Sequence, residues 1–593
     1  MLDREVLRHQ LVSRRTFLLA GGKISLLAAL LSRIFYLQLI KGNEYKILSD
    51  KNRINLVMLP PNRGIICDRN EVILADNRAS FSLKLDRRQA KSYKKSLETL
   101  INILSLSENE QKDIYNKIKK HNYKAPISLL YDLSWKRVSV VEERIFDLPA
   151  IYVDEINVRR YIFPEPNCHI TGYVGKVNEQ ELQESGQSEN DFQVGKSGIE
   201  KQYEKVLQGK FGYRKLEVDA HGLYVNQIQK IDSIQGNKIE LNIDSKLQEY
   251  LHSIMEPQGS SVIVMDVNNG ELIASASMPT YNPNDFVLGI SQKEWKKLTT
   301  DQFKPLINKT VQTQYPPGST FKLITVLAAL EAGIAPSQTF FCSGVIMLGN
   351  KEFRCWHLTG HGKLDMIEAI KHSCNCYMYN IAKLIGVETI LSVASRFGFG
   401  EQTGVDIPGE LKGFIPSRAW KIKKFKFDWS LGDAFNISIG QGPLLSTPMQ
   451  QIRMVAAIAN GGKLITPRIA KEHSLNIVDV GIKPEHLDII RKGMYKVMNE
   501  EGGTAYRYRP NNLIIAGKTG TSQVQAKKHA NHDLSSKSIR WERRNHALFA
   551  GYAPFDSPKY AINVIVDHGG GGGRTAAPIA AKTCENLYSF NSL

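Results

Sequence analysis

The residues with the clearest chemical potential are a serine and a lysine spaced one helical turn apart. Ser319 and Lys322 lie in YPPGSTFKLITVLAAL, where a Pro-Pro-Gly breaker precedes an apolar helical run. This order places Ser319 at a helix N-terminus, with Lys322 on the same face. A serine hydroxyl becomes a nucleophile when a nearby base takes its proton, and a lysine can do so if burial or cationic neighbours lower its pKa. The backbone N–H groups of a helix N-terminus can also stabilise an oxyanion.

A second motif, Ser373-Cys374-Asn375, follows the first in the chain. We expect Ser373 to relay a proton between the nucleophile and the leaving group, and Asn375 to hold a substrate amide. The commoner form of this triplet has Asp in the middle, where this chain has Cys374.

The third motif is Lys518-Thr519-Gly520-Thr521, which follows the apolar segment 513–516, a predicted strand. Lys518 supplies positive charge, and the hydroxyls of Thr519 and Thr521 can bind a substrate carboxylate. Gly520 lets a substrate backbone approach the strand edge closely. Each motif is common by chance, but three in this order indicate serine acyl-transfer chemistry. The predicted catalytic residues are Ser319, Lys322, Ser373, Asn375 and Lys518.

Cysteine and histidine side chains gather between the first two motifs. The predicted metal ligands are Cys342, Cys355, His361 and Cys374. The surrounding pattern of strand, turn, strand and loop lets Cys342 and Cys355 meet across a hairpin at Gly349-Asn350. Three cysteines and one histidine form a common closed zinc site, so we expect a structural zinc ion. A Cys342–Cys355 disulfide or buried free thiols are the alternatives, and His357 or Cys376 can replace one ligand.

Hydrophobic patterning predicts the elements that position these motifs. SSVIVMDVNNGELIASAS is a hairpin signal around Asn269-Gly270, and residues 546–568 form a second strand pair. Long helical patterns such as FKLITVLAALEAG and TPMQQIRMVAAIANGG lie between the two pairs. Strands at both ends with helices between them predict an α+β domain, with one mainly antiparallel sheet covered by helices. We expect the glycine run 569–573 to be a flexible turn.

Upstream of this domain the pattern is mixed. A hairpin is predicted around Asp68-Arg69-Asn70, between the apolar runs 64–67 and 72–74. Residues 86–146 are rich in lysine and mostly helical in pattern, and a strand is predicted near residues 150–161.

The N-terminal segment 17–40 reads FLLAGGKISLLAALLSRIFYLQLI. As a helix it is about 36 Å long, enough to cross a hydrocarbon core of about 30 Å. Arginines precede it, which places the N-terminus in the cytoplasm, and no small-residue cleavage site follows it. We therefore expect an uncleaved single-pass anchor rather than a buried soluble helix. The segment 13–18 also resembles a twin-arginine signal, so the sequence does not decide between the general secretion route and the twin-arginine route.

The composition is that of an ordinary globular chain. A chain of 593 residues is too long to fold around a single hydrophobic core, so we expect several domains. Of its residues, 42% are hydrophobic and 23% are charged. The net charge of +18 comes from scattered lysine and arginine. It suits a solvated surface, an anionic membrane or an acidic wall polymer, and no nucleic-acid-binding signature accompanies it, so we expect no nucleic-acid partner. The seven cysteines cannot all pair within one chain.

These motifs together resemble the class B penicillin-binding proteins, and most of all the elongation-specific penicillin-binding protein 2 group. PPNRGIICDRNEVILADN resembles the pedestal motif of the family, and RRYIFPEPNCHITGYVG and GKSGIEKQYEKVLQGKFG resemble its linker. IASASMPTYNPNDF, FNISIGQGPLLSTPMQ and AGKTGTSQV resemble its transpeptidase domain. The chain departs from the family at RNEV (69–72), where Gly commonly follows Asn, and this leaves the turn type open.

The resemblance implies a domain plan. It comprises a cytoplasmic tail (1–16), a transmembrane anchor (17–40), an elongated, dimerisation-like pedestal (41–240) and a transpeptidase domain (241–593). It places the chain in the bacterial inner membrane with the catalytic domain in the periplasm. The implied partners are a membrane-embedded glycan-polymerising glycosyltransferase and the elongation machinery.

The resemblance also implies a reaction. The enzyme would be a D,D-transpeptidase in which Ser319 attacks the D-Ala-D-Ala end of a peptidoglycan stem peptide and releases D-alanine. The amine of a neighbouring stem peptide would then resolve the acyl-enzyme. The N–H groups of Ser319 and Thr521 would form the oxyanion hole, and β-lactams would acylate Ser319. Some enzymes of the penicillin-binding protein 2 group carry a metal in the Cys/His stretch.

Three other functions share parts of this pattern. A serine β-lactamase has the same three motifs, but it needs a residue that activates water, and the sequence offers no glutamate for this role. A D,D-carboxypeptidase differs in passing the acyl group to water. A scaffold with a vestigial fold is the third alternative, and the intact motif residues argue against it.

Overall fold

The computed structural model describes residues 2–41, 54–87, 93–120, 126–178, 180–181, 192–218, 224–524 and 540–590. The chain divides into two compact units that interleave along the sequence. The first comprises residues 1–61, 79–156 and 210–234, and the second comprises 62–78, 157–209 and 235–593. All three motifs and the Cys/His cluster belong to the second unit.

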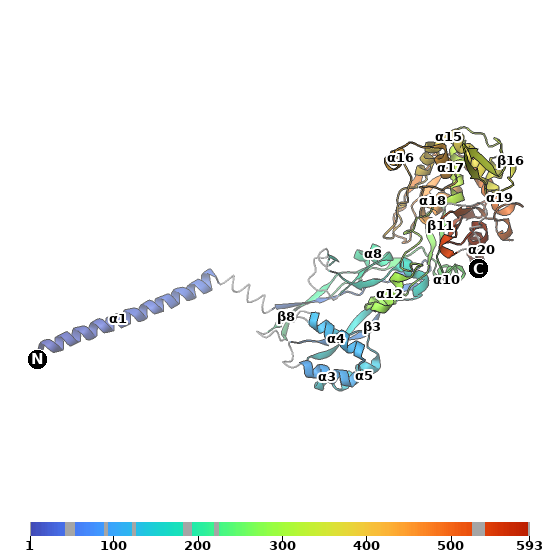
Figure 1. Cartoon of the computed structure of the whole chain (residues 1–593). Helices are drawn as coiled ribbons and strands as arrows, with labels where there is room; N and C mark the ends of the chain where they lie inside the picture. The colour runs from blue at the N-terminus through green and yellow to red at the C-terminus, as the bar shows by residue number, and fades with distance from the viewer. Residues whose placement is uncertain are drawn as a thin grey trace. The chain divides into compact units, whose positions relative to one another are not determined.

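The chain begins with a long helix, α1 (Leu2–Phe35), which continues as one π-helical turn (Tyr36–Ile40) (Figure 1). Its apolar part, Thr16–Ile40, is 25 residues long and unburied. Within the described part of the chain it is the one helix long and apolar enough to cross a membrane. This is compatible with a single-pass anchor, and the helix also includes most of the predicted cytoplasmic tail.

The first unit contains a three-stranded antiparallel sheet in the order β1-β8-β9. Its strands are β1 (Ile54–Leu59), β8 (Gly212–Val218) and β9 (Tyr224–Ile231). The outer strands therefore come from distant parts of the sequence, and β8 joins them.

A helical lobe completes the first unit and confirms the helical pattern of residues 86–146. It contains α3 (Tyr93–Leu104), α4 (Glu108–Lys120) and α5 (Trp135–Glu143). The segment also includes a strand, β4 (Ile127–Leu130), which pairs with the end of β3. The apolar stripes of the helices and the strand form one buried core.

In the second unit, the predicted hairpin around Asp68 is confirmed. β2 (Ile66–Cys67) pairs antiparallel with β3 (Ile73–Leu85). The buried carboxylate of Asp68 accepts hydrogen bonds from the Val72 N–H at 2.9 Å and the Ser245 hydroxyl at 2.7 Å. It therefore joins the hairpin to the start of α10 (Ser245–Ile254).

Glu71 stands in this turn where the family commonly has glycine. Its φ of 63° lies in the left-handed region, and its side chain is exposed. An L-residue with a Cβ adopts this conformation at a cost of about 1–2 kcal/mol. The turn thus keeps a shape that suits glycine although it contains glutamate.

A buried ion cluster stabilises the linker part of the second unit. Glu200 accepts hydrogen bonds from Arg63 Nε at 2.5 Å and Arg159 Nε at 2.7 Å. The Tyr161 hydroxyl donates to the same carboxylate at 3.2 Å. The predicted strand near residues 150–161 is confirmed as β5 (Ile151–Tyr161), and it provides Arg159 and Tyr161. The other linker elements are α6 (Pro164–Thr171), β6 (Val174–Lys176), β7 (Gln193–Gly195), α8 (Gly198–Gln202), α9 (Glu204–Leu207) and β10 (Ile239–Glu240).

The centre of the second unit is a five-stranded antiparallel sheet in the order β12-β11-β21-β20-β19. The strands are β11 (Ser260–Asp266), β12 (Leu272–Met278), β19 (Ala516–Ser522), β20 (His546–Ala553) and β21 (Tyr560–Val566). Side chains on both faces are buried, so helices must cover both. The covering helices include α10, α18 (Pro448–Ala459) and α20 (Gly572–Phe590) (Figure 1). The predicted α+β domain, with both strand hairpins, is confirmed.

A helical region of the same unit supplies the first two motifs. Its helices are a short 3₁₀ turn, η3 (Gly318–Phe321), then α13 (Lys322–Glu331), α14 (Met366–Lys371), α15 (Asn375–Arg396), α17 (Leu431–Ser438) and α19 (Pro484–Asn499). The small strands are β13 (Phe340–Cys342), β14 (Val345–Leu348), β15 (Lys351–Arg354) and β16 (Gly362–Leu364). The remaining elements are α11 (Asn284–Val287), α12 (Gln292–Thr300), α16 (Arg418–Phe425), β17 (Lys463–Ile465) and β18 (Ile477–Asp479).

Candidate active site

Ser319 lies in the 3₁₀ turn η3, directly before α13. Gly318 precedes it with a φ of 55°, and its N–H donates to the Gly440 carbonyl at 2.9 Å. A Cβ at Gly318 would lie 2.8 Å from the carbonyl oxygen of Thr521, so only glycine fits there. The Pro-Pro-Gly breaker thus places the serine between the helix start and the strand of the third motif.

Lys322 is fully buried, and its amine joins the first motif to the second. Its Nζ donates to the Ser373 carbonyl and to Asn375 Oδ1, each at 2.7 Å, and lies 3.2 Å from Ser373 Oγ. Burial lowers the pKa of Lys322 to about 8, because the interior solvates an ammonium ion poorly. Lys322 and the middle motif therefore converge in space, and Ser319 lies in the turn directly before Lys322.

The middle motif has a constrained backbone. Ser373 adopts a left-handed φ of 51°, and its N–H donates to the Ile370 carbonyl at the end of α14. Asn375 then begins α15, and its Nδ2 donates to the Arg354 carbonyl at 3.2 Å. The amide is thus held at both ends, by Lys322 and by β15.

The third motif is itself a strand, β19, at the edge of the sheet. We expected the strand at residues 513–516, but it begins at Ala516 and contains the motif. The motif residues are part of the strand because they pair regularly with β20: Thr519, for example, lies opposite Phe549. Lys518 is fully buried, and burial, reinforced by the charge of Lys322, lowers its pKa well below the usual range.

Gly520 has a packing role in addition to the one we expected. A Cβ there would lie 3.1 Å from Thr320 Cγ2 and 3.1 Å from Leu548 Cβ. Glycine therefore lets the strand pack against the nucleophile turn. The glycine run 569–573 is not the flexible turn that we predicted, because a Cβ at Gly572 would lie 2.2 Å from the Gly520 carbonyl. Gly572 and Gly573, the end of the run, pack closely against β19 and the loop at Thr504 and begin α20, whereas a Cβ at Gly571 would meet nothing within 4 Å.

Two further side chains contact the third motif, and the sequence did not single them out. Gln441 donates from Nε2 to the Thr521 carbonyl at 3.2 Å. Thr504 Oγ1 lies 2.6 Å from Thr519 Oγ1. Gly502 and Gly503 predict a loop beside Thr504, but this local pattern does not indicate that Thr504 contacts Thr519.

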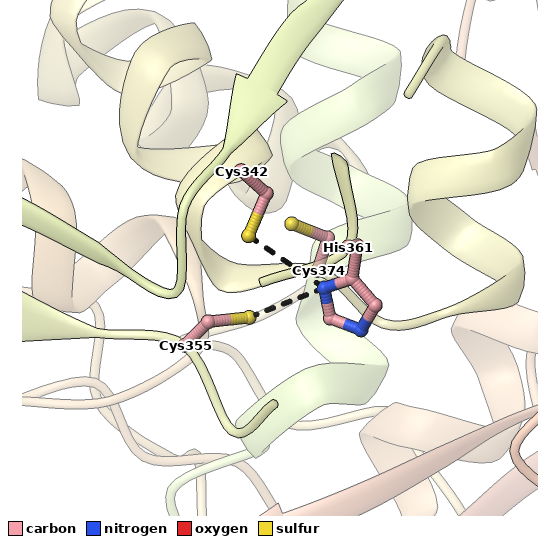
Figure 2. Close-up of side chains that lie close together, drawn as sticks. All are labelled: Cys342, Cys355, His361 and Cys374. Atoms are coloured by element: carbon pink, nitrogen blue, oxygen red, sulfur yellow. Dashed lines mark hydrogen bonds between the residues drawn. The ribbon is translucent and has the colours of Figure 1, made fainter. Parts of the chain in front are cut away.

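The four predicted metal ligands lie together near the middle motif, as Figure 2 shows. One donor atom from each of Cys342, Cys355, His361 and Cys374 lies within 4.8 Å of all the others. The sulfurs of Cys342 and Cys355 each lie 3.6 Å from Nδ1 of His361. The predicted hairpin at Gly349-Asn350 is confirmed by the pairing of β14 with β15.

The environment of this cluster lowers the pKa of Cys342 and Cys355, while the hydrogen bond to Cys355 raises the pKa of the Cys374 thiol. Hydrogen bonds from the Cys374 and Cys376 thiols lower the pKa of Cys355 far below its usual range. The second ring nitrogen of His361, Nε2, is buried and has no hydrogen-bond partner among the described residues. All seven cysteines are buried and unpaired.

The cluster is hydrogen-bonded directly to the middle motif. The Asn375 N–H donates to Cys355 Sγ at 3.4 Å, and Cys374 Sγ accepts the Tyr377 N–H at the start of α15. The Trp356 indole N–H donates to the His372 carbonyl at 2.9 Å. The Cys/His cluster therefore stabilises the backbone that carries Ser373 and Asn375.

Two known domain families match the chain. Residues 58–241 match the Penicillin-binding Protein dimerisation domain, and residues 260–585 match the Penicillin binding protein transpeptidase domain. Together they cover most of the sequence and include the three motifs and the Cys/His cluster.

Similar proteins cover nearly the whole length. The peptidoglycan D,D-transpeptidase MrdA of Salmonella typhimurium is 33% identical, over 98% of this chain and 96% of its own. Penicillin-binding protein 2 of Helicobacter pylori, solved in complex with MreC, has a TM-score of 0.82 at 33% identity, with 91% of this chain and 99% of that chain covered. A chain of a peptidoglycan synthase complex has a TM-score of 0.69 at 28% identity, with 96% and 97% covered.

Proposed function

This chain belongs to the penicillin-binding proteins, in the penicillin-binding protein 2 group of peptidoglycan D,D-transpeptidases, and we propose that Ser319 is its nucleophile. Ser319 Oγ bonds to the carbonyl carbon of the penultimate D-alanine of a stem peptide, and the terminal D-alanine leaves. The amine of a second stem peptide then displaces Ser319 and completes the cross-link. The observation that carries this assignment is the buried amine of Lys322, three residues after Ser319, which Ser373 and Asn375 hold in place.

The hydrogen bonds of Lys322 suit a general base. A neutral amine donates two hydrogen bonds, and the carbonyl oxygens of Ser373 and Asn375 accept both at 2.7 Å. Its lone pair then remains for the proton of a hydroxyl group. Ser373 Oγ, 3.2 Å from the amine, is placed to pass a proton onward to the leaving group. With a pKa of about 8, Lys322 can both take and return a proton near neutral pH.

Two backbone N–H groups are candidates for the oxyanion hole. By analogy with the family, they belong to Ser319 and Thr521. The close approach of Gly318 to Thr521 supports this role, because it brings the turn and the strand within reach of one substrate carbonyl. Donors fixed in the backbone stabilise the charge as it develops without reorganising.

The third motif provides the recognition of substrate charge. A substrate carboxylate near the buried Lys518 would favour the protonated form of this lysine. Thr519 and Thr521 share one face of β19, where they can donate to the same carboxylate. β19 is the edge strand of the sheet, so its outer side can pair with the substrate backbone.

The test of this function is covalent labelling. Fluorescent penicillin should label the wild-type chain at Ser319, and Ser319→Ala should lose the label while its melting temperature stays close to wild type. Ser253→Ala is a matched control, because this exposed serine lies in α10, outside the three motifs and the Cys/His cluster, and it should label fully. Unchanged labelling of Ser319→Ala would show that another residue is the nucleophile.

We also propose that Cys342, Cys355, His361 and Cys374 bind a structural zinc ion. Tetrahedral zinc, with Zn–S of about 2.3 Å and Zn–N of about 2.0–2.1 Å, separates sulfur from nitrogen by about 3.6 Å. The two measured sulfur–nitrogen distances are both 3.6 Å, which supports this fit. Four protein ligands leave no position for a reacting water, so the ion would stabilise the backbone of the middle motif.

The anchor and partners follow from family membership. We propose that α1 crosses the inner membrane once, with the catalytic unit in the periplasm, as the arginines before the span favour. The similar structures include penicillin-binding protein 2 with MreC and a peptidoglycan synthase complex. By analogy, the chain works with the elongation machinery and a membrane-embedded glycosyltransferase.

A further inference from the structure

A second threonine lies behind the hydroxyl that would bind the substrate carboxylate. Thr504 Oγ1 and Thr519 Oγ1 are 2.6 Å apart, a short hydrogen bond between two hydroxyl groups. Thr519 is only 7% exposed, so little water can replace this contact. Thr504 belongs to the loop after α19, and that loop has no part in the three motifs.

The backbone holds Thr504 firmly against the end of α19. The Gly503 N–H donates to the Glu500 carbonyl at 3.0 Å, and the Ala505 N–H donates to the Val497 carbonyl at 3.1 Å. A Cβ at Gly503 would lie 2.4 Å from that Val497 oxygen, so glycine is required beside the threonine. The loop conformation is therefore determined by close packing.

Two other elements fix the same position. A Cβ at Gly573, in the first turn of α20, would lie 2.4 Å from the Thr504 carbonyl, so this glycine lets the helix start approach the loop. Asn499 Nδ2 donates to the Ile515 carbonyl at 2.9 Å, which joins the end of α19 to the residue before β19. Thr504 is thus positioned by α19, α20 and β19 together.

The chemistry of the pair sets the direction of the hydrogen bond. Each hydroxyl has one proton, and a carboxylate only accepts. When Thr519 donates its proton to a carboxylate, the bond between the two threonines must come from Thr504. We propose that Thr504 is a positioning residue, which donates to Thr519 and so orients the Thr519 hydroxyl toward the substrate carboxylate. This rests on the proposed function of the third motif.

The arrangement strengthens the contact with the carboxylate. A hydroxyl that accepts one hydrogen bond is a better donor in the next, because the bonds polarise one another. Without Thr504, the Thr519 oxygen loses a donor in a site with little water. A lost hydrogen bond of this kind corresponds to about a tenfold weaker interaction.

The test compares two probes that differ in one charge. Benzylpenicillin carries the carboxylate, and its methyl ester does not. We expect Thr504→Val in the full-length chain to lower the acylation rate constant kinact/KI for benzylpenicillin about tenfold, mostly through KI. The rate with the methyl ester should change by less than about twofold. Thr504→Ser keeps the hydroxyl and should restore the wild-type ratio between the probes. Thr389→Val, in α15, is the matched control.

The outcomes separate this inference from the proposed function. Acylation of Thr504→Val by the ester shows that its nucleophile is intact, so a selective loss with benzylpenicillin supports the positioning role. An unchanged ratio in Thr504→Val, or a Thr504→Ser variant as impaired as Thr504→Val, would overturn it. Wild-type chain that neither probe acylates at Ser319 would overturn both the proposed function and this inference.

Discussion

Lys322 has to be buried enough to lose a proton and yet hydrogen-bonded enough to stay in place. Burial lowers its pKa to about 8, and the carbonyl oxygens of Ser373 and Asn375 fix the amine. An amine accepts the serine proton only in its neutral form. The fraction in that form rises as pH rises through the pKa.

The first prediction at this scale concerns Lys322. Acylation of wild type should rise with pH up to about 8 and level off above it, because the pKa of Lys322 is about 8. Lys322→Ala should lower the rate at least about 10²-fold, and Lys322→Arg should recover little, because guanidinium does not deprotonate. Stopped-flow acylation from pH 6 to 10 measures this. A fast arginine variant would show that Lys322 is not the base.

At the scale of elements, the Cys/His cluster ties β13, β15 and the start of α15 to the middle motif. Besides the thiols of Cys374 and Cys376, Cys355 Sγ contacts Nδ1 of His361 and the N–H of Asn375. A metal ion that held this sulfur would therefore also hold the residue that anchors Lys322. Metal content and acylation should change together.

The second prediction concerns this cluster. Elemental analysis of the purified chain should give about one zinc per chain, since the donor set fits one tetrahedral ion. Cys355→Ser should lose the zinc, lower the melting temperature and slow acylation by penicillin. Cys168→Ser is the matched control, because this buried cysteine lies outside the cluster. Zinc-free, fully active wild type with a Cys342–Cys355 disulfide in peptide mapping would reject the site.

The third prediction concerns the turn between β2 and β3. Glu71→Gly should be more stable than Glu71→Ala by about 1 kcal/mol, because both variants lose the carboxylate but only glycine relieves the left-handed strain at φ 63°. Thermal melting of the two variants side by side measures the difference. Equal melting temperatures would mean that the strain is not stored in this turn.

At the scale of the whole molecule, one apolar helix precedes all the chemistry. The exposed face of α1 suits a lipid environment, and the site lies entirely in residues downstream of it. In the orientation that we propose, the catalytic unit lies outside the cytoplasmic membrane and α1 keeps it attached there. The anchor would serve both needs.

The fourth prediction tests this topology. Alkaline phosphatase fused after residue 50, which lies outside the described residues, should be active, and β-galactosidase fused at the same point should be inactive. The positive-inside arginines before the span are the reason. The reversed pattern of activities would place residue 50 in the cytoplasm and overturn the orientation.

Much of this protein follows from local sequence. The breaker before Ser319, the Asn269-Gly270 hairpin and the helix beginning at Pro448 are encoded within a few residues, because turn chemistry and hydrophobic period act over short distances. The three motifs likewise indicate serine acyl-transfer chemistry from residue types and chain order alone. The spacing of Cys342 and Cys355 around a turn even indicated that they would meet.

Other features were decided only by tertiary packing. The pair of Thr504 and Thr519 depends on how α19, α20 and β19 meet, and no local pattern records that distance. The same is true of Gly520, whose lack of a side chain lets β19 pack against the nucleophile turn, and of Gly572 and Gly573, where close packing excludes a Cβ. Local preferences determine which elements form. The shapes of side chains brought together from distant positions determine which atoms touch, because interiors are close-packed.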